Sequence, residues 1–310
     1  MVTHLPTFSV ITPVFNGEKF IEETIASVLN ACKGVQFEYI VIDDGSTDNT
    51  GSVLERFSDK ITIISQQNQG ESQSVNVGIE SSRGKYLIVV SADDPLLGSE
   101  IFMDVEELFT QDPSLVAIYP DWQIIDAAGA VLEVKNLPDF TEEDFLAKNL
   151  VLPGPGTIFR RAAAIKIGGR RSKWRFVGDY DFWLRLSDEG RFLHRNRVLA
   201  QWRHHGESTS VSARGPQMAE ERITVISDYL NNTSRSISKR IARIAQANAY
   251  ALAARLIFFS TEVPGKRYLM KSLFLRRSWP ERLRPAEGLY IVLHPLSKFL
   301  VYPIRELITR

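Results

Sequence analysis

Residues 85–94 read KYLIVVSADD, an apolar run long enough for a buried strand that ends on two adjacent carboxylates, Asp93 and Asp94. Two like charges side by side at the edge of an apolar core repel each other, by about 4 kcal/mol at ~4 Å where the local dielectric constant is near 20. A second run of the same design, FEYIVIDDGS, occupies residues 37–46. Two apolar strands that both end on paired charges indicate a fold in which strand ends carry chemistry.

Strands and helices alternate around these two runs. FSVITPVF and ITIISQ have the β-branched and aromatic composition of strands. Apolar residues recur at helical spacing between the strands and after the last of them. The alternation predicts parallel βαβ units with buried strands. The expected strands lie within 8–15, 37–46, 61–66 and 85–94, and the expected helices lie within 20–29, 47–57, 70–82 and 101–109.

The two carboxylate pairs belong at one edge of this sheet. In parallel α/β sheets the carboxyl ends of the strands meet, and ligands bind there. Asp43 and Asp44 end one strand, and Asp93 and Asp94 end another, so we expect all four to face one crevice. The alternative is that each pair is an exposed turn, because aspartate is common in turns. Two pairs on two strands favour a single site.

After residue 110 the pattern is mixed. We expect a strand at 114–126, a hairpin turn, a Gly/Pro loop that runs into a short strand at 152–161, and a helix at 178–190. From about residue 216 the sequence is helical. The predicted fold is therefore α/β, a mainly parallel sheet flanked by helices with a helical C-terminal extension.

Bulk composition excludes several classes of protein. The chain has 310 residues, 44% of them hydrophobic, and 37 basic residues balance 37 acidic ones, so no general attraction to nucleic acid is expected. A single cysteine, Cys32, rules out a disulfide framework and a cysteine-based metal site. The start of the sequence lacks signal-peptide features, and no apolar run reaches about 18 residues. We therefore expect a cytoplasmic protein.

The clustered carboxylates suit a hard divalent cation. Mg²⁺ or Mn²⁺ takes one or two carboxylates, keeps several waters and binds a substrate's phosphates. A nucleotide diphosphate is the natural third party. The sequence has no GxxxxGK[ST], and no GxGxxG follows the first strand, which argues against P-loop hydrolysis and against hydride transfer on a dinucleotide.

Five segments in order carry a family resemblance. They are SVITPVFNGEKFIEETIASVL, EYIVIDDGSTDNT, NQGESQSVNVGIESSRGKYLIVVSADD, GTIFRRAAAIKIGG and GDYDFWLRL. Together they resemble the family-2 glycosyltransferases of the Rossmann-like GT-A fold over roughly residues 7–210. The resemblance implies an inverting enzyme that uses one divalent metal, Mn²⁺ or Mg²⁺. It would move a sugar from a nucleotide diphosphate, with UDP favoured, to a hydroxyl of a saccharide or lipid-linked acceptor in polysaccharide or glycolipid synthesis.

The resemblance also implies a domain plan and a base-binding site. Residues 1–212 would form the catalytic domain, with a nucleotide-sugar half to about 110 and an acceptor half from about 111, and residues 213–310 a helical region. The residues expected at the nucleotide base are Pro13, Val14 and Phe15, which flank it, and Asp44, which hydrogen-bonds it, with Asp43 beside it.

The family's acidic DxD region lands on SADD. By this resemblance Asp93 would hold the ribose or the donor sugar, and Asp94 the metal. Ser91 occupies the first position, where an acidic residue is commoner. Asn76 would contact the donor, with Val75 in a place where many relatives carry arginine.

The family's general base lands on Asp179. Inversion requires the acceptor oxygen to attack from the face opposite the leaving diphosphate, so a base is needed near that oxygen. Taken alone, Asp179 could instead be a helix N-terminal residue favoured by the macrodipole. Gly178 stands where relatives have glutamate, and Asp181 is a reserve candidate. His205 would ligate the metal or contact phosphate, and Arg203 would stabilise the diphosphate charge.

Two points stay open at the level of sequence. From residue 266 onward basic residues alternate with large apolar ones, which suits either an anionic membrane surface or a helical subdomain packed on the catalytic domain or on a second copy. The departures at Ser91, Val75 and Gly178 also leave room for a catalytically silent nucleotide-sugar binder. A sugar nucleotidyltransferase is the weaker alternative, because TPVFNGEKF is a poor Gly-rich basic loop.

Overall fold

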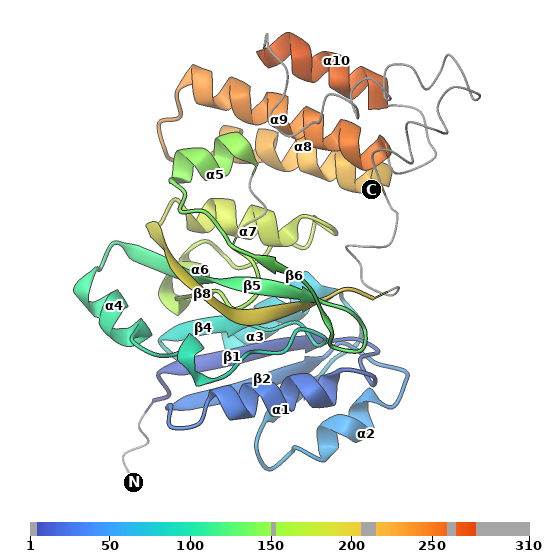
Figure 1. The fold of residues 1–310 in the computed structure, drawn as a ribbon, viewed down its shortest axis with the longest axis vertical. Coiled ribbons are helices and arrows are strands. Elements are labelled where there is room, and N and C mark those ends of the chain that lie inside the picture. Colours follow the sequence, from blue (N-terminus) through green and yellow to red (C-terminus); the bar gives the residue numbers. More distant parts are fainter. Residues whose placement is uncertain (1–4, 150–152, 206–214, 259–264, 277–310) are drawn as a thin grey trace. The chain divides into compact units, whose positions relative to one another are not determined.

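The computed structural model describes residues 5–149, 153–205, 215–258 and 265–276 (Figure 1). The chain divides into two compact units. The sheet unit comprises Met1–Thr141, Val151–Lys173 and Gly178–Val211, and the helical unit comprises Glu142–Leu150, Trp174–Val177 and Ser212–Arg310.

An eight-stranded sheet forms the sheet unit, in the order β3-β2-β1-β4-β7-β5-β6, with β8 paired to β5. Four strands, β3, β2, β1 and β4, run parallel to one another, and β8 runs parallel to β5. Strand β7 pairs antiparallel with β4 and β5, and β6 pairs antiparallel with β5. The mainly parallel α/β sheet expected from the sequence is therefore confirmed. The strands are β1 (Phe8–Val14), β2 (Phe37–Asp43), β3 (Thr62–Ser65), β4 (Tyr86–Val89), β5 (Leu115–Ile125), β6 (Val131–Lys135), β7 (Ile158–Arg160) and β8 (Arg191–Arg203).

Helices cover both faces of this sheet (Figure 1). On one face Ile25 of α1 is fully buried in the core cluster with Val10 of β1. On the other face Gly78 of α3 lies on Ile11, and a Cβ there would be 2.3 Å from Ile11 Cγ2, so the missing side chain lets α3 approach closely. The helices are α1 (Ile21–Ala31), α2 (Thr50–Glu55), α3 (Glu71–Ser81), η1 (Ser99–Ile101), α4 (Val105–Gln111), α6 (Arg161–Lys166) and α7 (Gly178–Leu186).

The register brings the acidic segments to one edge. Val14 at the end of β1 pairs with Asp43 of β2, and Ile11 pairs with Val89 of β4. Strand β4 ends at Val89, earlier than the strand expected over 85–94, so Asp93 and Asp94 lie in the turn beyond it. Because Asp93 and Asp94 in this turn do not pair with a neighbouring strand, their side chains can have different surroundings.

The helical unit contains α5 (Glu142–Lys148), α8 (Gly215–Asn232), α9 (Lys239–Phe258) and α10 (Gly265–Arg276). Alanines of α9 pack against both neighbouring helices. Ala253 packs with Ala219 of α8, and Ala254 packs with Leu269 of α10. The predicted helical character after residue 216 holds here, and residues 277–310 lie outside the described part. Within the described ranges no helix is both long and apolar enough to cross a bilayer. The short helices α5 and α6 were not predicted.

Candidate active site

The loops that follow β1 and β2 brace each other at the carboxyl edge of the sheet. Asn16, in a left-handed conformation at φ 54°, donates its backbone N–H to Ser46 Oγ at 3.0 Å. Its Oδ1 accepts from Thr47 N at 2.8 Å, and Gly17 N donates to Thr50 Oγ1 at 2.8 Å. The residues that end both strands are therefore held in a fixed relation.

Side chains expected at the nucleotide base differ in accessibility. Pro13 and Val14 are buried within β1, whereas the Phe15 side chain is 51% exposed. Asp43 is half-buried and accepts from Ser46 N through Oδ1 at 3.0 Å. Phe15 and Asp43 can therefore present side-chain atoms to a ligand, and the other two contribute backbone and packing.

Asp44 is held by the protein itself. Its carboxylate is 2% exposed and accepts from Gln66 Nε2 at 2.7 Å, Gln69 N at 2.9 Å and Gly70 N at 2.8 Å. These three donors from the chain secure the loop between β3 and α3, and the contact of Asp44 to a base stays a prediction.

Asn76 is likewise occupied by the protein. Its Oδ1 accepts from Arg170 N at 2.7 Å, and its Nδ2 donates to Arg170 O at 2.8 Å. Val75 points into the core with 1% exposure. Asn76 thus forms a two-point clamp between α3 and the loop that follows α6, and its contact to the donor stays a prediction.

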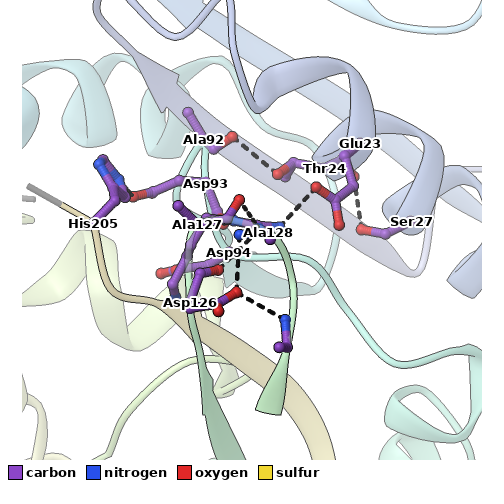
Figure 2. A network of polar contacts seen from close by, with 12 residues as sticks. Glu23, Thr24, Ser27, Ala92, Asp93, Asp94, Asp126, Ala127, Ala128 and His205 are labelled. Carbon is purple, nitrogen blue, oxygen red and sulfur yellow. Dashed lines mark hydrogen bonds and ion pairs between the residues drawn. The ribbon is translucent and has the colours of Figure 1, made fainter. Parts of the chain in front are cut away.

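Asp93 and His205 lie together (Figure 2). His205 Nε2 is 2.8 Å from Asp93 Oδ2, and the side chains are 13% and 29% exposed. The His205 ring also contacts Phe20, with ring centroids 4.8 Å apart. The turn after β4 and the segment after β8 thus bring a carboxylate and an imidazole to the same place, although they are far apart in sequence.

Asp94, expected to hold the metal, is buried instead. It is 7% exposed, and its Oδ1 accepts from Arg203 N at 2.8 Å. Burial, and then the charge of Asp93, raise the pKa of the Asp94 carboxyl well above its usual range, while hydrogen bonds from Arg203 N and the Ser91 hydroxyl oppose that rise. Ser91 therefore supplies a donor where a third carboxylate would add repulsion.

Arg203 is also held by the protein. The side chain was expected to contact phosphate, but the residue is 1% exposed. Its Nε donates to Asp93 O at 3.0 Å, and its Nη2 is 2.7 Å from Glu23 Oε2. These contacts hold the guanidinium inside the protein, and its contact to a diphosphate stays a prediction.

Asp179 lies in the first turn of α7. It is half-buried, and its Oδ1 accepts from Tyr180 N at 2.7 Å. The reserve candidate Asp181 is 1% exposed, accepts from Arg185 Nε at 2.9 Å and is paired with Arg171. Asp181 is therefore a structural residue, and Asp179 is the carboxylate of this helix that solvent can reach.

A divalent cation fits Asp93 and His205. Their facing atoms are 2.8 Å apart. Adjacent donors on one octahedral ion, each at about 2.1 Å, are separated by roughly 3 Å. No cluster of three or more His, Cys, Asp or Glu suited to a metal occurs among the described residues. A cation here would therefore depend on water and on substrate phosphates for its other ligands.

Comparison with known proteins assigns the family. The model of glycosyl transferase family 2 matches residues 9–166. The chain belongs to this family. This membership agrees with the enzyme class that the ordered motifs predict. The matched range includes both acidic segments at the edge of the sheet.

Family-2 relatives include large polysaccharide synthases. The chain is 26% identical over 234 residues to hyaluronan synthase of Pasteurella multocida and 29% identical over 231 residues to chondroitin synthase of Escherichia coli. These matches cover 74% and 73% of this chain but 24% and 33% of the synthases, so the chain spans a quarter to a third of their length. An uncharacterized glycosyltransferase of Rickettsia prowazekii is 28% identical over 67% of both chains.

Solved glycosyltransferases share the fold. The structure of S. aureus TarS 1–349 with UDP-GlcNAc matches 93% of this chain and 87% of its own, with a TM-score of 0.67 and 16% identity. The mannosyltransferase PcManGT of Pyrobaculum calidifontis, with GDP-Man and Mn²⁺, matches 96% of this chain and 88% of its own, with a TM-score of 0.59 and 16% identity. At this identity the likeness shows the GT-A fold.

Sequence reasoning about this family-2 member missed Glu23 and Phe20. Glu23 of α1 contacts Arg203, and Phe20, the residue before α1, contacts both Arg203 and His205, yet both lie far from the acidic turn in sequence. Glu23 follows another glutamate, Glu22, and the sequence pattern does not indicate which of the two pairs with Arg203. The charge of Arg203 was the available signal, because a buried cation requires a carboxylate partner.

Proposed function

We propose that this protein is an inverting, metal-dependent glycosyltransferase that moves a sugar from a UDP-sugar to an acceptor hydroxyl in polysaccharide or glycolipid synthesis. The observation that carries the proposal is the pairing of Asp93 with His205 at 2.8 Å beyond the carboxyl ends of a parallel sheet. Family membership and relatives named hyaluronan and chondroitin synthases support it. Solved neighbours with UDP-GlcNAc and GDP-Man support a nucleotide-sugar donor.

Donor binding follows from the residues that remain accessible. Phe15 offers an exposed ring for the base, and Asp43 a carboxylate beside it. Asp93 and His205, and not Asp94, would hold Mn²⁺ or Mg²⁺ next to the diphosphate. The bound cation would neutralise the negative charge that develops on the leaving diphosphate.

Asp179 is the proposed general base. The acceptor oxygen forms a bond to the anomeric carbon while the bond from that carbon to the diphosphate oxygen breaks, and the acceptor proton passes to an Asp179 oxygen. A carboxylate is a weak base for a sugar hydroxyl, so proton transfer accompanies bond formation instead of preceding it. Asp179 lies in the first turn of α7 with a half-buried side chain, so an acceptor hydroxyl can approach its carboxylate.

The test is Asp179→Asn, assayed with a panel of nucleotide sugars with and without Mn²⁺. We expect transfer to fall by about 10²- to 10⁴-fold while UDP binding, measured by calorimetry, stays unchanged. Asp188→Asn, in the turn after the same helix, is the control and should transfer normally. Near-normal transfer by Asp179→Asn would contradict the base assignment. A wild-type protein that binds UDP and Mn²⁺ but turns over no donor would be the silent binder.

We further infer that the outward face of α10 contacts anionic lipid at the inner face of the cell membrane. This face consists of Arg267, Met270, Lys271 and Phe274, all exposed and spaced i, i+3, i+4 and i+7, with Phe274 82% exposed. The opposite side of α10 is buried within the helical unit. Two cations beside two large apolar side chains complement a negatively charged bilayer surface.

A further inference from the structure

Arg203 joins four segments of the sheet unit, and Figure 2 labels its partners Glu23, Asp93, Asp126 and Ala127. Beyond its bonds to Asp93 and Glu23, its Nη1 donates to Asp126 O at 3.3 Å and Ala127 O at 3.2 Å, in the turn between β5 and β6. Its guanidinium lies 4.9 Å from the Phe20 ring centroid. One side chain thus connects α1, the acidic turn, the β5–β6 turn and the end of β8.

Glu23 contributes a carboxylate in direct contact with this guanidinium, and the charge of Asp94 acts on Arg203 as well. A buried cation is costly unless a carboxylate pairs with it. The other acceptors of the Arg203 side chain named here are neutral backbone carbonyls, whereas Glu23 Oε2 at 2.7 Å carries charge. Arg203 is 2% exposed at its side chain and Glu23 is 55% exposed, so the pair reaches from the interior to solvent.

Two more polar side chains of α1 hold the acidic turn on either side of the aspartates. Thr24 Oγ1 donates to Ala92 O at 2.9 Å, and Leu96 N donates to Ser27 Oγ at 3.1 Å. Together with Glu23 acting through Arg203, one side of α1 fixes the turn that carries Asp93. The same Arg203 precedes His205 by two residues in the chain, so its position limits where the imidazole can lie.

We propose that Glu23 is a positioning residue: through its ion pair with Arg203 it holds Asp93 and His205 at the spacing that binds the divalent cation. This inference rests on the proposed metal-dependent function. Glu23 touches neither Asp93 nor His205 in any contact described above, and it acts by fixing the guanidinium that bonds Asp93 O. Removal of groups that orient metal ligands typically weakens metal binding by 10- to 100-fold.

A substitution at Glu23 tests this better than one at Arg203. Loss of a buried arginine would leave several carbonyls without a donor, and the chain could fail to fold. Glu23→Gln keeps the size of the side chain and removes its charge. Glu22→Gln is the matched control, because Glu22 is adjacent, is 56% exposed and pairs with Arg56 of the segment after α2.

The experiment has three readouts on the full chain. Electron paramagnetic resonance measures Mn²⁺ binding in the presence of UDP. Mass spectrometry measures amide hydrogen exchange, and circular dichroism measures the melting temperature. For Glu23→Gln we expect about tenfold weaker Mn²⁺ binding and faster exchange in peptides that cover 91–96 and 200–205. The melting temperature should fall by about 4 °C or less, because one partner is exposed. Glu22→Gln should match wild type in the first two readouts.

Other outcomes are decisive in different ways. Wild-type Mn²⁺ affinity and exchange in Glu23→Gln overturn the proposal. Faster exchange throughout the sheet unit with unchanged Mn²⁺ affinity also overturns it, because Glu23 would then serve stability alone. If wild type binds no Mn²⁺ with UDP, the metal part of the proposed function fails. Exchange then decides the positioning role: a change confined to the two peptides supports it, and no change refutes it.

Discussion

Asp93 and Asp94 are neighbours in the sequence but face different surroundings. Asp93 is partly exposed and contacts an imidazole, whereas Asp94 is buried and accepts a backbone N–H. Since burial disfavours the charged form of Asp94, a neutral isostere there removes an unfavourable charge and keeps an acceptor oxygen for Arg203 N. These differences separate a ligand-facing carboxylate from a structural one.

We expect Asp93→Asn and Asp94→Asn to have opposite consequences. Asp93→Asn should weaken Mn²⁺ binding at least tenfold, because it removes a proposed ligand, with little change in melting temperature. Asp94→Asn should keep Mn²⁺ affinity within about threefold, because the neutral side chain preserves the bond to Arg203 N. Paramagnetic resonance titrations and thermal melts measure both. The reverse pattern would return the metal to Asp94, as the sequence suggested.

The loop after α6 is held against α3 by a close approach of its backbone to the Asn76 side chain. The loop after α6 contains Gly168 and Gly169, at φ 75° and 66°, followed by the residue that Asn76 clamps. A Cβ on Gly169 would lie 2.3 Å from Asn76 Oδ1, whereas a Cβ on Gly168 would have no atom within 4 Å. The clamp between α3 and this loop therefore depends on one glycine more than on the other.

Gly168→Ala and Gly169→Ala form a matched pair. Both place alanine in the left-handed region, which costs about 1–2 kcal/mol. Gly169→Ala should lower the free energy of unfolding by a further ~1–3 kcal/mol, because the new Cβ displaces Asn76 and leaves its buried partners unsatisfied. Urea denaturation of both variants gives the difference. Equal losses would mean that the loop adjusts without breaking the clamp.

The molecule combines a sheet unit that carries the candidate site with a helical unit that exposes a basic and apolar helix face. The inner side of α10 packs on α9 of the same unit through Ala254 and Leu269. Its outward face keeps Met270 at 55% and Phe274 at 82% exposure. These exposed apolar residues beside cations are the observation on which the proposed lipid contact rests.

Binding to vesicles tests this surface. We expect the full chain to sediment with phosphatidylglycerol-containing vesicles more than with pure phosphatidylcholine. Phe274→Ser should reduce binding about tenfold, since loss of a buried phenylalanine costs about 1.5–3 kcal/mol. Leu132→Ser, at a 60% exposed position in β6, is the control and should bind normally. No preference for anionic vesicles, with a dimer that Phe274→Ser dissociates in light scattering, would assign the face to a second copy.

Local patterns predicted most of the fold. Continuous apolar strands and helical spacing are properties of neighbouring residues, so the alternation over residues 8–111 and its parallel sheet followed directly. Short elements such as α6 carried too few apolar positions to be recognised. In the site, His205 and Asp93 lie together as strand ends and the family motifs suggested, whereas the protein partners of Asp44, Asn76 and Arg203 were not foreseen.

The amino-acid sequence was sufficient to place acidic groups at one edge of a parallel sheet, because strand direction and apolar periodicity are encoded locally. Tertiary structure alone decided which of those groups are buried and which partners they have. Asp94 is bonded to Arg203 N, and Asp93 is paired with His205, partners more than a hundred residues away along the chain. Long-range hydrogen bonds of this kind leave no local periodicity, so burial and partner can be known only once the chain is folded.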